Sequence, residues 1–210
     1  MTHTLHRRGN VADLREDYAM LILPARGINR EGCEEKMRQI WEVISHYEKN
    51  LANFGNHDPT WGKTPPYSFE ELKKTKSWIA HAVFKDGETL KACLRELKER
   101  NFGISVVVSG VFEEVGKICA GAGLSPHTVN QSLGIHGNTA KLPDEQVLEI
   151  ITMCGHAMVS SHLVIHLVEK IREGKMSYEK AAGELSKMCD CGVFNPYRAE
   201  KILRRIASRW

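Results

Sequence analysis

The apolar positions of this chain of 210 residues follow one pattern up to about residue 142 and another pattern after it. Short apolar runs predict buried strands over residues 18–24, 78–84 and 103–110, the last of them rich in β-branched side chains. Apolar side chains that recur every three or four positions predict helices over residues 32–49 and 111–121, and another that begins near Gly87. A fourth strand is expected over residues 127–135. Residues 50–68, rich in Asn, Gly and Pro, are expected to form a long loop.

After Pro143 the pattern predicts helices alone, over residues 144–153, 157–172 and 177–187 and from Asn195 to the end. We therefore expect an α/β or α+β fold with an N-terminal part, residues 1–142, and a helical part, residues 143–210. The first part would hold a mixed or parallel sheet of about four strands with crossover helices, preceded by a basic arm over residues 1–16. The strand order stays open between a ferredoxin-like and an open parallel arrangement, and the two parts could share one core.

Composition narrows the function classes. Apolar residues make up 42% of the chain and charged residues 26%, and the net charge is +3, which argues against a dedicated nucleic-acid binder. No apolar stretch reaches the roughly 18 residues of a membrane helix. The first residues also lack the apolar core of a secretory signal, so we expect a cytoplasmic protein with reduced thiols.

Three of the six cysteines form the sharpest chemical pattern in the chain. Cys154 precedes Gly155, and Cys189 and Cys191 stand one residue apart before Gly192. Both segments lie between predicted helices, where glycine lets the backbone turn sharply. We expect the three thiols to converge on one metal ion or cluster.

Two cofactors fit three thiolates. One is a [4Fe–4S] iron–sulfur cluster with one iron left open for a substrate, which the tight Cys-x-Cys spacing favours over zinc. The other is zinc bound by the three cysteines with His156 as the fourth ligand. Two readings need no metal: a thiol-dependent enzyme, or small side chains buried in a core.

The function predicted first is an iron–sulfur enzyme with redox or Lewis-acid chemistry on a small substrate, working with that substrate or a redox partner. His127 and His136 flank the expected fourth strand and are the candidates for proton transfer. The alternative is a zinc-stabilised binding or regulatory module whose basic last helix, with Arg198, Lys201 and Arg205, meets a partner. Whether the chain forms a homo-oligomer is left open.

Overall fold

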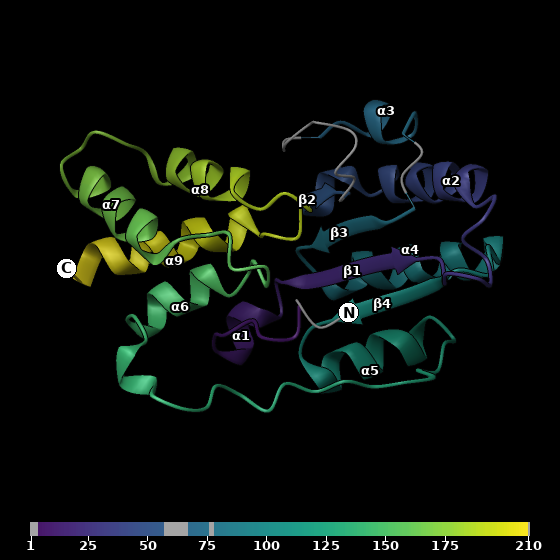
Figure 1. Cartoon of the computed structure of the whole chain (residues 1–210), viewed down its shortest axis with the longest axis horizontal. Helices are drawn as coiled ribbons and strands as arrows, with labels where there is room; N and C mark the ends of the chain where they lie inside the picture. The colour runs from purple at the N-terminus through teal and green to yellow at the C-terminus, as the bar shows by residue number, and fades with distance from the viewer. Residues whose placement is uncertain (1–3, 57–66, 76–77, 210) are drawn as a thin grey trace.

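The computed structural model describes residues 4–56, 67–75 and 78–209 (Figure 1). Its sheet holds β1 (Tyr18–Leu23), β2 (Leu51–Gly55), β3 (Ala80–Phe84) and β4 (Ser105–Ser109) in the order β2-β3-β1-β4. Every neighbouring pair is antiparallel. The class of helices and strands together was predicted, but the expected mixed or parallel sheet was wrong, because the sheet is antiparallel throughout.

Two helices set this strand order. α2 (Glu34–Ser45) joins β1 to β2, which lie on either side of β3, and α4 (Gly87–Arg100) joins β3 to β4, which lie on either side of β1. Helix α2 therefore crosses over β3, and α4 crosses over β1. As a result, all four strands alternate in direction. This is the ferredoxin-like arrangement, one of the two that the sequence pattern left open.

One strand was missed and another was predicted where none forms. β2 lies in the segment that was expected to be a loop. The sequence Leu-Ala-Asn-Phe-Gly has little β propensity, so this strand depends on its pairing with β3. The expected strand over residues 127–135 is instead exposed and without regular structure. Among the described residues, the sheet contains no strand paired with this segment, and local β propensity does not replace such a partner.

The sheet packs on both faces. Helices α2 and α4 cover one face, where Met20, Ile22, Trp41 and Leu90 lie in the first core. Ala19 and Val83 point to the opposite face and pack into a second core with the C-terminal helices. These helices gather beside the sheet at the left of Figure 1, and α5 (Phe112–Gly121) lies along β4.

The C-terminal region places two irregular links next to this second core. Its helices are α6 (Glu145–Ile151), α7 (Ser161–Arg172), α8 (Tyr178–Lys187) and α9 (Pro196–Arg209). Ser177 caps α8 as predicted, since its hydroxyl accepts from the backbone N–H of Lys180 at 3.2 Å. The remaining short elements are α1 (Val11–Leu14), α3 (Phe69–Leu72), η1 (Glu48–Asn50) and η2 (Thr139–Lys141). Within the described ranges, none of the helices has the length and apolarity needed to span a membrane.

Candidate metal centre

The two links that join the C-terminal helices carry the three cysteines. Cys154 lies in the α6–α7 link, residues 152–160, and Cys189 and Cys191 lie in the α8–α9 link, residues 188–195. All three thiols are buried, with 2%, 0% and 1% exposure respectively. Segments 35 residues apart in sequence therefore meet in the second core.

The three cysteines and His156 lie next to one another in a row. The sulfur atoms of Cys189 and Cys191 are 3.9 Å apart, and the Cys191 sulfur lies 3.8 Å from Nδ1 of His156. Cys154 lies beside Cys189, which raises the pKa of the Cys154 thiol. Over the part of the chain that the structure describes, no three His, Cys, Asp or Glu side chains already converge as a finished metal site. The four side chains are neighbours in a line and do not yet surround a common point.

Each of the three sulfur atoms has a nearby backbone N–H group that lowers its pKa. Val193 has this effect on Cys191, Phe194 on Cys189, and Met158 and His156 on Cys154. Such donors stabilise a thiolate and are typical of the surroundings of metal-bound cysteine.

The three thiols differ in acidity because of their contacts with one another. The hydrogen bond between Cys191 and Cys189, helped by the Val193 N–H, holds the pKa of Cys191 below its ordinary value in spite of burial. The hydrogen bond from Cys154 lowers the pKa of Cys189, but the bond to Cys191 and burial outweigh it and raise that pKa to about 11. The hydrogen bond to Cys189 and burial raise the pKa of Cys154. Cys191 is thus the first of the three to become a thiolate.

The α8–α9 link rests directly on strand β2. Gly192 adopts φ +72°, and a Cβ at this position would lie 2.5 Å from the carbonyl oxygen of Phe54. A Cβ on Gly55 would lie 3.1 Å from the carbonyl oxygen of Cys191. The Tyr67 hydroxyl donates to the carbonyl of Asp190 at 2.8 Å. Two glycines are therefore needed here for close approach of backbone to backbone.

The α6–α7 link is strained beside the histidine. Ala157 adopts φ +56°, a left-handed conformation that residues with a Cβ rarely take, and its N–H donates to the carbonyl of Cys154 at 3.1 Å. His156 is exposed, whereas the three thiols are buried. Strained backbone of this kind is concentrated at functional sites, and here it turns the link so that His156 faces Cys191.

Arg7 and His81 are two features of this region that the sequence pattern did not single out. The Arg7 guanidinium donates to the carbonyl oxygens of Met153, at 3.4 Å, and of Val193. His81 in β3 is 1% exposed and pairs in register with Gly55, next to the cysteine-bearing link. A lone histidine in an apolar strand was the available signal for His81, and Arg7 gave none beyond the basic character of the arm.

The two histidines expected to transfer protons do not join the cysteine row. His136 is exposed, and its Nε2–H donates to the carbonyl of Leu133 at 2.9 Å. His127 is exposed too and lines a cavity of about 600 Å³ beside β4 and α5. Both lie on the irregular segment that follows α5, away from the links that hold the cysteines.

The basic residues of α9 are engaged inside the molecule. Arg198 is 1% exposed and pairs with Asp17 at 3.0 Å. Arg205 pairs with Glu149 at 2.8 Å, and Lys201 pairs with Glu16. The three basic side chains that the sequence pattern assigned to a partner therefore have intramolecular partners.

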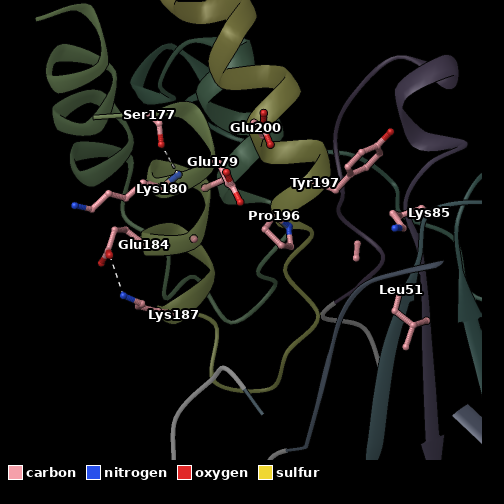
Figure 2. Close-up of a pocket in the computed structure, with 13 residues that line it drawn as sticks. Leu51, Lys85, Ser177, Glu179, Lys180, Glu184, Lys187, Pro196, Tyr197 and Glu200 are labelled. Carbon is pink, nitrogen blue, oxygen red and sulfur yellow. Dashed lines mark hydrogen bonds and ion pairs between the residues drawn. The ribbon is translucent and has the colours of Figure 1, made fainter. Parts of the chain in front are cut away.

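A second hollow, of about 640 Å³, lies between α8, α9 and β2 (Figure 2). Its charged side chains have both signs and partly neutralise one another, as in the Glu184–Lys187 pair at 2.8 Å. The cysteines do not line it. The hollow therefore adds no chemistry to the cysteine row.

Comparison of the chain with protein-family models, with curated proteins and with solved structures finds no match. The argument for function therefore rests on the geometry of this site. Three buried thiols in a row, one exposed imidazole and a set of N–H donors can bind a cation that prefers sulfur and nitrogen.

Proposed function

We propose that the chain is a metalloprotein that binds one metal ion, zinc in the first place, through Cys154, Cys189, Cys191 and His156. The 3.9 Å separation of the Cys189 and Cys191 sulfur atoms carries this proposal. Two sulfur ligands of one tetrahedral ion lie about 3.8 Å apart, since each Zn–S bond is about 2.3 Å long. Two cysteines on different irons of a cubane cluster lie on the order of 6 Å apart.

The ligand types and the surroundings support the same choice. Three thiolates with one imidazole form a Cys₃His set, which is common in structural zinc sites. To complete a tetrahedral site, the side chains of Cys154 and His156 would have to move toward the Cys189–Cys191 pair, beside which both lie. Zinc with three thiolates has a net charge of −1, and the backbone N–H groups around the sulfurs offset that charge.

The proposed role is that of a zinc-stabilised binding or regulatory module. A closed site of four protein ligands leaves no position for a substrate, so its contribution is to folding. The ion would join the α6–α7 link to the α8–α9 link, and the second of these rests on the sheet.

A [4Fe–4S] cluster in a redox or Lewis-acid enzyme is the second candidate. The N–H groups directed at all three sulfurs favour it, because such donors also tune cluster potentials. With three cysteines, one iron would stay open to a small substrate. This candidate requires the Cys189–Cys191 pair to separate by a further 2 Å or so beyond the present spacing.

Purification without oxygen, followed by elemental analysis, separates the candidates. One zinc per chain supports the proposal, whereas about four irons with inorganic sulfide and brown absorption near 400 nm support the cluster. Serine at each of positions 154, 189 and 191 should reduce the bound metal. Cys119→Ser is the matched control, since this half-buried thiol lies in α5, in the other core. A chain that holds no metal after reconstitution with zinc or with iron and sulfide overturns both candidates.

A further inference from the structure

The N-terminal residues 4–17, which we call the docked arm, contact both cysteine-bearing links. Within it, the backbone N–H of Arg8 donates to the hydroxyl of Thr152 at 3.1 Å, in the α6–α7 link. The side chain of Arg7 reaches both links. The arm thus contacts the segments that bear the proposed ligands, although these lie more than 130 residues away in sequence.

One guanidinium bridges the two links. Arg7 donates to the carbonyl of Met153, directly before Cys154, and to the carbonyl of Val193, two residues after Cys191. Its side chain is 5% exposed. A carbonyl has a fixed direction, so a single planar guanidinium with both carbonyls as acceptors fixes how the two links face each other.

A buried carboxylate holds Arg7 in this position. Asp17, whose side chain is 0% exposed, pairs with Arg7 and with Arg198, the latter at 3.0 Å. It also accepts from Nδ2 of Asn195 at 3.0 Å. Asn195 and Arg198 stand at the junction of the α8–α9 link with α9. The guanidinium is therefore fixed from the side of the arm and from the side of the cysteines.

On the basis of the proposed metal site, we propose that binding of zinc and docking of the N-terminal arm are coupled through Arg7. Arg7 is a positioning residue: it holds the two links at the spacing that the ion requires, and it touches no proposed ligand atom. An ion on the cysteines would fix the same two links and so the two carbonyls that Arg7 binds. Coupling of this kind is reciprocal, so the arm strengthens zinc binding by the factor with which zinc strengthens arm docking.

Zinc affinity, measured by competition with a chromophoric chelator, tests the first half of this coupling. Arg7→Gln should bind zinc at least about tenfold more weakly than the unmodified chain. Arg7→Lys keeps the charge but reaches fewer acceptors, and should fall between them. Arg8→Gln is the matched control, because the Arg8 side chain pairs with exposed Glu145 and its backbone contact stays. It should bind zinc within about twofold of the unmodified chain.

The rate of tryptic cleavage after Arg15 tests the second half. The unmodified chain should be cut more slowly with zinc than with a chelator, and Arg7→Gln should lose this difference. A merely structural role of Arg7 would speed cleavage equally with and without zinc.

Three results overturn parts of the argument separately. If the unmodified chain binds one zinc and Arg7→Gln binds it as tightly as Arg8→Gln, the coupling is wrong and the metal site stands. If the unmodified chain binds no zinc, the proposed function itself fails. If Arg7→Gln does not fold, tryptic cleavage of the unmodified chain tests the coupling by itself. Equal rates of cleavage after Arg15 with and without zinc would reject the coupling.

Discussion

Replacement of Gly192 by alanine tests how closely the cysteine-bearing link must approach the sheet. Gly174, at the end of α7, offers a matched control with nearly the same backbone conformation. The two glycines have φ values of +72° and +69°. A Cβ at Gly174 would meet no atom within 4 Å, whereas one at Gly192 would lie 2.5 Å from the Phe54 carbonyl oxygen and 2.8 Å from the Gly55 nitrogen.

The expected magnitudes follow from these distances. The left-handed conformation should cost either alanine roughly 1–2 kcal/mol in the free energy of unfolding. At position 192 an ordinary contact of 3.4 Å exceeds the available 2.5 Å by 0.9 Å, and the opposing atoms are backbone that no rotamer change can move. Overpacking of this kind adds about 1–3 kcal/mol, so we expect Gly192→Ala to lose about 2–5 kcal/mol in total.

Urea unfolding monitored by circular dichroism measures both variants, and zinc competition measures their metal binding. Gly174→Ala should lose the smaller amount and bind zinc as the unmodified chain does. Gly192→Ala should lose the larger amount and bind zinc more weakly, since the link must shift away from β2. Equal unfolding free energies and equal zinc affinities for the two variants would refute the contact between this link and the strand.

Further predictions concern the buried charges, the tyrosine and the thiols. Asp17→Asn should lower the free energy of unfolding by about 3–5 kcal/mol, because it leaves the buried guanidinium of Arg7 without its counter-ion and leaves Arg198 with only the more distant carboxylate of Glu149. Glu145→Gln, at the exposed end of a salt bridge, should cost under about 1 kcal/mol in the same urea titration, and equal losses would contradict the burial argument. Tyr67→Phe removes one buried hydrogen bond to the link and should cost about 1 kcal/mol, measured by thermal unfolding; no change in stability would count against that bond. Zinc binding at pH 7 should release about two to three protons per ion, because the raised pKa values of Cys154 and Cys189 keep those thiols protonated until metal displaces the protons. Affinity should therefore rise with pH, and calorimetry in buffers of different ionisation enthalpy counts the protons; a count near zero would exclude thiolate ligands.

The elements that the sequence predicted are those whose burial follows from their own pattern. In α4, Leu90, Leu94 and Leu97 lie on one buried face, as the spacing indicated, and Ser177 caps α8. β2 could not be found in this way, because Asn53 and Gly55 within it weaken the strand signal. The sequence also could not decide between the ferredoxin-like and the open parallel arrangement, since pairing between strands far apart in sequence leaves no mark on either strand alone.

The residues of the candidate site also divide into those with a local signal in the sequence and those without one. Two thiols one residue apart before a glycine give a local signal, and the structure brings Cys154 and His156 to them. Arg7 acts through carbonyl groups, and any residue type supplies a carbonyl, so its partners could not be recognised in the sequence. His81 depends on the register between β2 and β3, which the missed strand concealed.

The position of the cysteine row favours a metal with a structural role over one with a catalytic role. Four separate segments meet there: the arm through Arg7, strand β2 at Gly55, and the two links between helices. The links have no regular structure, so ordering each of their residues costs about 1–2 kcal/mol of backbone entropy. Hydrogen bonds to carbonyls return about 1 kcal/mol each, and the buried side chains of Met153, Val159, Val193 and Phe194 return about 1.5–3 kcal/mol each. An ion bound by both links would add to these terms and hold the two links together.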